Sequence, residues 1–156
     1  EISKIETFFK DKIIDNKKLE IILNTKENED FDILKDEALS GNNFKTNELL
    51  NITVMDSDKN VLYLNIINQR LNRLSEAYAL ANETSLNNVV ENMRPPIFWK
   101  DKPVFLNQMN KLNSNKIRKI QKKTYNLEIE LKSNSTINKQ LLIKKLLVDI
   151  CQLANS

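Results

Sequence analysis

Residues 59–82 read KNVLYLNIINQRLNRLSEAYALAN and carry the clearest periodic pattern in the chain. Apolar side chains recur there at steps of three and four residues, at Leu64, Ile67, Leu71, Leu74, Tyr78 and Ala81. Because residues with this spacing share one face of a helix, the segment predicts a long amphipathic α-helix. Its broad apolar face needs other helices to cover it, which indicates an all-α helical bundle.

The same spacing predicts shorter helices elsewhere in the chain, over 2–9, 19–23, 30–39, 44–52, 85–93, 103–112, 114–131 and 135–153. Their expected N-caps are the short polar residues Asp30, Ser85, Ser114 and Ser135. Gly41 is placed to end the helix over 30–39 in a left-handed conformation. The residues before Pro95 and Pro96 are pushed out of helical geometry, so a rigid corner is expected there.

Composition supports one helical core and argues against a β-rich fold. The chain has 156 residues, of which 40% are hydrophobic and 29% charged, as in an ordinary globular domain. One glycine and three prolines leave few residues for the turns that hairpins require. No apolar run approaches the roughly 20 residues of a membrane span, and no signal-peptide pattern opens the chain, so a cytoplasmic protein is expected.

The run NTKENED at residues 24–30 is the best candidate for a linker. It predicts a boundary near Asn28, with one unit over 1–27 and a second over 28–156. The chain also opens on Glu1 and passes directly into an apolar pattern, which predicts a piece of a longer protein.

The segment after Ser135 is apolar nearly all round, with a narrow polar stripe at Asn138, Lys145, Asp149 and Gln152. Such a helix is either central in its own bundle or covered by a partner, because each exposed Leu or Ile forgoes about 1.5–3 kcal/mol of burial. Leu142 and Leu146 are therefore candidate residues of a protein interface.

The residue inventory excludes most familiar active sites, so neither an enzyme nor a cofactor is expected. The chain has no histidine for proton transfer or zinc binding and too few glycines for a phosphate-binding loop. Asp56–Asn60 resembles the start of a calcium loop, but Val61 stands where the turn glycine belongs. Cys151 is alone and lies in an apolar run, which indicates a buried thiol in a reducing compartment.

Two further features could bind partners. The stretch 111–123 is rich in lysine, and Lys116, Lys119, Lys122 and Lys123 are candidate phosphate contacts. A solvated helix face explains these charges more simply, but a small nucleic-acid-binding module is the alternative function. Trp99, beside Phe98 and just after the prolines, is either a plug in the corner between helices or an exposed anchor for a partner; the plug is favoured.

The stretch RPPIFWKDKPVF at residues 94–105 resembles the delta-subunit family of the bacterial DNA polymerase III clamp loader. FDILKDEALSG at 31–41, the long helix that follows and LEIELKS at 127–133 resemble the same family in order, so the likeness covers nearly all of the chain. Residues 106–112 depart from the family, whose helix there is often richer in Ala and carries a Trp.

The resemblance implies a non-catalytic part of the clamp loader, which places the sliding clamp on primed DNA in chromosomal replication. It implies that 28–156 form the helical collar domain and that 1–27 end the AAA+-like lid domain. The implied partners are the gamma/tau and delta prime subunits. The family contacts the clamp through an N-terminal region almost wholly absent from these residues, and DNA only indirectly or weakly through the collar.

Overall fold

The computed structural model describes residues 25–81, 85–133 and 138–156. Within these ranges the chain contains seven α-helices and no strand, which confirms the predicted all-α fold. The helices are α3 (Thr25–Leu39), α4 (Asn43–Ile52), α5 (Asn60–Leu80), α6 (Leu86–Asn92), α7 (Lys102–Lys111), α8 (Ser114–Ser133) and α9 (Lys139–Asn155), with a 3₁₀ turn, η1 (Ser57–Lys59), before α5.

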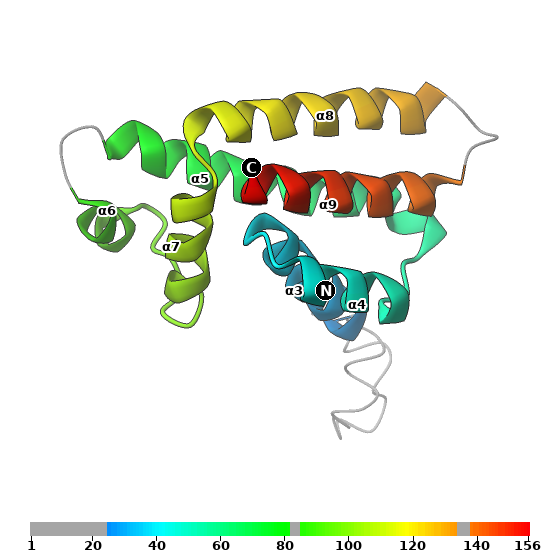
Figure 1. Ribbon diagram of the computed structural model, residues 1–156, viewed down its shortest axis with the longest axis horizontal. Helices are drawn as coiled ribbons and strands as arrows, with labels where there is room; N and C mark the ends of the chain where they lie inside the picture. The colour runs from blue at the N-terminus through cyan, green and yellow to red at the C-terminus, as the bar shows by residue number, and fades with distance from the viewer. Residues whose placement is uncertain (1–24, 82–84, 134–137) are drawn as a thin grey trace, which may run out of the picture.

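The long helix α5 is the element around which the others are arranged. It packs most extensively against α8 and also contacts α9, and α8 and α9 lie side by side (Figure 1). Helices α3 and α4 cover another side of α9, whereas α6 and α7 pack against α5. In Figure 1 the short helices α6 and α7 lie at one end of the molecule, opposite the end where α5 begins.

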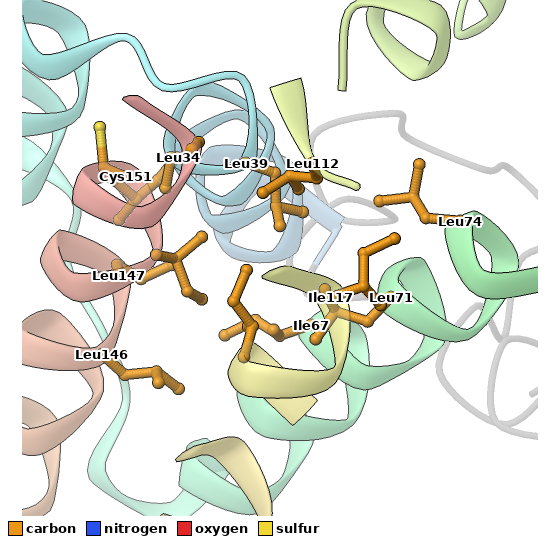
Figure 2. Packing of buried hydrophobic residues seen from close by; sticks show 14 of the residues in the cluster. Leu34, Leu39, Ile67, Leu71, Leu74, Leu112, Ile117, Leu146, Leu147 and Cys151 are labelled. Atoms are coloured by element: carbon orange, nitrogen blue, oxygen red, sulfur yellow. The ribbon is translucent and has the colours of Figure 1, made fainter. Parts of the chain in front are cut away.

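The core sits where α3, α5, α8 and α9 meet. Leu34, Ile67, Leu71, Ile117 and Leu147 have no exposed surface and point toward one another (Figure 2). Burying each such side chain stabilises the fold by about 1.5–3 kcal/mol, so the predicted apolar face of α5 supplies a large share of the stability. This is the packing that the spacing in 59–82 indicates.

Gly41 ends α3 as predicted, with a φ of 71°. Its amide donates to the Ala38 carbonyl at 3.1 Å, and the Asn42 amide donates to the Glu37 carbonyl at 3.0 Å. These two bonds form a Schellman motif, which satisfies the last carbonyls of the helix. Ser85 caps α6 as predicted, with its side chain accepting from the Asn88 amide.

Several predicted helix ends are wrong. Helix α3 begins at Thr25, so the boundary near Asn28 falls inside a helix and Asp30 is not its N-cap. Asn113 rather than Ser114 accepts the bond that caps α8, from the Lys116 amide at 2.9 Å. The last helix begins at Lys139 with Asn138 as its cap. The predicted helices over 2–9 and 19–23 and the predicted cap Ser135 lie outside the described residues.

Helix α9 is covered mainly by its own chain. Its buried residues are Ile143, Leu146, Leu147, Ile150, Cys151 and Ala154. The breadth of its apolar surface is thus explained largely by contacts with α3, α4, α5 and α8. Among the helices that the structure describes, none is both long and apolar enough to cross a membrane.

Candidate interaction surfaces

The proline corner, residues 94–101, is fixed to α5 and α7 by hydrogen bonds. Arg73 donates to the carbonyl oxygens of Arg94, at 3.1 Å, and Pro95. The amides of Asp101 and Lys102 donate to the Phe98 carbonyl at 2.9 and 3.2 Å and form a turn that leads into α7. Because these bonds hold both ends of the corner, its backbone has one well-defined path.

Beneath the corner, Arg70 joins three elements through a polar network. Its guanidinium donates to both carboxylate oxygens of Asp101, at 2.5 and 3.1 Å, and to Gln108 Oε1 at 2.6 Å. Gln108 in turn donates to the Asp36 carboxylate at 3.0 Å, and the guanidinium lies 4.7 Å from the centre of the Phe105 ring. Only 11% of the Arg70 side chain is exposed. The Asp101 side chain is 35% exposed, and a partly buried bidentate pair of this kind fixes geometry more strictly than a fully exposed ion pair.

The corner exposes two neighbouring aromatic side chains. Phe98 is 62% exposed and Trp99 68% exposed, with ring centroids 5.8 Å apart. The prediction that Trp99 plugs the corner is therefore wrong, because Ile97 is the buried residue there. Trp99 instead lies at the surface, with Lys100 Nζ 5.3 Å from the centre of its ring.

A cavity of about 360 Å³ lies beside the aromatic pair. Pro95, Pro96 and Phe98 line it together with Ile66 and Phe105. Arg70, Arg73, Lys35, Asp32 and Asp101 supply the polar part of the lining. The cavity thus has a mixed apolar and polar lining, in which the charged side chains are already held in ion pairs.

A second surface lies at the opposite end of the bundle. We call it the bundle end and define it by six exposed apolar residues: Ile52, Val54, Val61, Leu62, Ile129 and Leu141. The end of α4, the start of α5, the last turns of α8 and the first turn of α9 meet there (Figure 1). Lys144 Nζ donates to the Leu50 carbonyl at 2.7 Å and Gln140 donates to the Met55 carbonyl, which fixes α9 against α4.

The two leucines predicted as interface residues lie in different environments. Leu146 is 4% exposed and belongs to the core, whereas Leu142 is partly buried. Both line a cavity of about 200 Å³ between α8 and α9, together with Lys123 and Asp149. Leu146 therefore stabilises the bundle itself, and Leu141, which is 64% exposed, is the leucine of α9 that lies at the surface.

The predicted phosphate contacts on α8 are not equivalent. Lys123 Nζ pairs with Asp149 at 2.6 Å, and Lys116 Nζ donates to the Lys111 carbonyl at 3.2 Å. Lys119 and Lys122 are exposed, and neither forms an ion pair with any described residue. Arg118 and Tyr125 extend the same exposed side of α8.

The described residues include no group of three His, Cys, Asp or Glu side chains placed to hold a metal ion. Asp56, from the calcium-like stretch, instead caps η1 by accepting from the Asp58 amide at 2.9 Å. Burial raises the pKa of the Cys151 thiol, while a hydrogen bond from Thr46 lowers it and the charge of Glu37 raises it. A buried thiol with a raised pKa is a poor nucleophile, which fits a packing role.

Sequence reasoning identified Trp99 but missed most of these surfaces. Phe98 carries the same signal as Trp99, an aromatic residue just after two prolines. Arg70 could not be paired with Asp101 from sequence, because the two lie 31 residues apart. The bundle end draws on four separate helices, so no local pattern reveals it.

Comparison with protein-family models, with curated proteins and with solved structures gave no match to this chain.

Proposed function

We propose that this chain is a non-catalytic oligomerisation module that associates with other helical proteins through the bundle end. The single observation that carries the proposal is the gathering of six exposed Ile, Leu and Val side chains at that end. Exposed apolar side chains that gather at one end of a folded domain are typical of a surface that a partner covers.

Burial of the bundle end offers a moderate driving force. Each fully buried Leu, Ile or Val contributes about 1.5–3 kcal/mol, and these six are already partly covered, so the total is on the order of 5–10 kcal/mol. Association costs about 4–15 kcal/mol in lost translational and rotational freedom. Stable assembly therefore requires further contacts beside this patch, as when each subunit touches two neighbours in a ring.

The resemblance to the delta-subunit family supplies the proposed context. In that context, helices α3 to α9 form a collar domain of the DNA polymerase III clamp loader in the cytoplasm. The gamma/tau and delta prime subunits are the proposed partners, and the sliding clamp is contacted by a region outside these residues. The all-α fold, the rigid corner at 94–101 and an exposed apolar end are the features that support this context.

Charged substitutions at the bundle end test the proposal. Val54→Glu and Leu141→Glu place a carboxylate on the patch without disturbing the core, and glutamate in the first turn of α9 suits the helix dipole. Sedimentation velocity should show binding to the gamma/tau and delta prime subunits for the unmodified chain and weaker binding for both variants. Leu80→Glu is the matched control, because Leu80 is 52% exposed and lies at the last residue of α5, at the opposite end of that helix from the patch. Equal binding by all four proteins contradicts the proposal.

The alternative is a nucleic-acid-binding module built on α8. Arg118, Lys119 and Lys122 are exposed on one side of this helix and form no ion pair with a described residue, which favours phosphate contact. Neutralising these three side chains to Gln should lower DNA affinity and flatten its salt dependence by about 0.9 per lost phosphate contact. If partner assembly is lost in the same variant, α8 belongs to the protein interface instead.

A further inference from the structure

The proline corner presents Phe98 and Trp99 in a way that needs a separate explanation. It lies near α6 and α7, at the opposite end of the bundle from the patch described above (Figure 1). Two adjacent large aromatic side chains, both more than 60% exposed, leave apolar area in water that folding has not removed. An exposed aromatic pair contributes little buried area to the fold, and it offers apolar surface to a partner.

Contacts within the chain hold the backbone that carries these rings. Ile97, between the prolines and the aromatic pair, is buried and anchors the chain against the core. Arg73 and the turn at Phe98–Lys102 fix the backbone on either side. Binding therefore costs little additional ordering, and a rigid aromatic anchor is the usual form of an interface hot spot.

The charges around the aromatic pair are predominantly positive. Arg94, Lys100 and Lys102 lie within five residues of it, and none forms an ion pair in the described parts of the chain. Asp101 forms an ion pair with Arg70, and Glu76 forms one with Arg73. Glu91, which precedes the corner in the sequence, is an acidic side chain without an ion pair among the described residues. The field at this surface favours an acidic partner.

The neighbouring cavity has room for an apolar side chain. Pro95, Pro96, Phe98 and Phe105 supply apolar lining there. The two carboxylates in the lining are each paired with a cation, Asp32 with Lys35 and Asp101 with Arg70, so neither opposes an acidic segment. The rings of Phe98 and Trp99 are inclined at 50° to each other, so they do not form a parallel platform for successive bases.

We propose that the proline corner, together with Lys102 at the start of α7, is a docking site for an acidic peptide segment of a partner protein. An apolar side chain of that segment enters the cavity beside Phe98, and its carboxylates face Arg94, Lys100 and Lys102. This site is distinct from the bundle end. The proposal does not depend on the oligomerisation role, and the two fail separately.

Selection from a displayed library of random twelve-residue peptides tests the proposal on the full 156-residue chain. The enriched peptides should combine two or more Asp or Glu residues with a Phe, Leu or Ile. Trp99 is the single tryptophan of the chain, so a tryptophan-free enriched peptide should shift its fluorescence to shorter wavelength on binding. Twelve-nucleotide oligothymidylate is the nucleic-acid probe in the same titration.

Surface variants locate the binding. Phe98→Ser and Lys100→Glu should each weaken the selected peptide about tenfold, as expected for a hot-spot residue and for a reversed charge beside it. Tyr125→Ser is the matched control and should bind as the unmodified chain does. It removes an equally exposed aromatic ring from α8, outside the proline corner.

Four results overturn the proposal: no enriched peptide, enrichment of basic peptides, binding that survives Phe98→Ser, or tighter binding of oligothymidylate than of any peptide. The last result assigns the corner to nucleic acid. Circular dichroism of each variant separates loss of binding from loss of fold.

Discussion

At the scale of single residues, Gly41 fixes how α3 meets the C-terminal end of α9. Its φ of 71° is a conformation that residues with a side chain adopt only with strain. An added Cβ there lies 3.0 Å from Asn155 Oδ1 and 3.2 Å from the Ala154 Cβ. The Asn155 side chain also donates to the Gly41 carbonyl at 2.7 Å. One residue thus meets a backbone requirement and a packing requirement together.

Gly41→Ala should therefore destabilise the protein by about 1–2 kcal/mol, the usual cost of forcing a side chain into the left-handed region. Urea unfolding followed by circular dichroism measures the change. Asn47→Ala, at an exposed position of α4, is the control and should stay within about 0.5 kcal/mol of the unmodified chain. An unchanged midpoint for Gly41→Ala would show that the α3–α9 junction relaxes without cost.

Arg70 is the residue that joins α5, α7 and the proline corner. Arg70→Leu leaves Asp101 and Gln108 without their donor and should cost about 2–3 kcal/mol, because each charged hydrogen bond contributes about 1.5–3 kcal/mol. The effect of Asp101→Asn should not add to it, since both substitutions break the same contact. A double-mutant cycle from urea unfolding measures the coupling, and additive effects would contradict the network.

Tyr78 predicts how stability changes at alkaline pH. Its hydroxyl donates to the Met109 carbonyl, and burial raises its pKa above the ordinary 10.0. The folded state therefore keeps a proton that the unfolded state loses as pH rises past about 10. The stabilising contribution of Tyr78 is complete below that pH and declines above it, until pH exceeds the raised folded pKa.

Tyr78→Phe should cost about 1 kcal/mol at neutral pH through the lost hydrogen bond. The difference in unfolding free energy between the two proteins should shrink above pH 10, because only the unmodified chain has this group to ionise. Comparing the pair cancels the titration of Cys151 and the lysines. A difference that grows with pH would contradict the assignment.

At the scale of elements, residue spacing predicted where the helices lie, but it did not predict which of their side chains are exposed. Apolar steps of three and four located α5, α8 and α9, since a helix records its buried face in its own sequence. Gly41 ends α3 and Pro95 follows the end of α6, as expected, because the backbone preferences of glycine and proline are local. Asn113 took the capping role expected of Ser114, one residue away, since either side chain can accept the bond.

The surfaces depend on packing between distant segments and were therefore harder to predict. Leu141 and Leu146 lie in the same apolar run, and nothing local distinguishes the exposed residue from the buried one. Trp99 was expected to be buried in its short corner, but it is exposed and Ile97 is the buried residue there. The charges of Lys119 and Lys123 differ in effect only because Asp149 of α9 lies beside one of them.

Helix α9 permits a matched test of these two environments. Leu146→Ala removes core packing and should cost about 2–5 kcal/mol, whereas Leu141→Ala should change stability by less than about 0.5 kcal/mol. Thermal unfolding measures both. Partner binding should show the reverse order once the temperature keeps both variants folded. Equal destabilisation by the two substitutions would place Leu141 in the core.

At the scale of the whole molecule, the bundle separates its binding surfaces. The bundle end lies where α4, α5, α8 and α9 meet, and the proline corner lies beside α6 and α7 (Figure 1). Under the proposed role, one end of the chain contacts neighbouring subunits while the other end remains accessible to a second partner.

The most direct test of that role is light scattering on a sizing column, with the chain alone and then mixed with the gamma/tau and delta prime subunits of its own organism. We expect co-elution as a complex of defined mass, lost with Leu141→Glu and retained with Leu80→Glu. A folded monomer that elutes apart from those subunits at micromolar concentration would contradict the oligomerisation role.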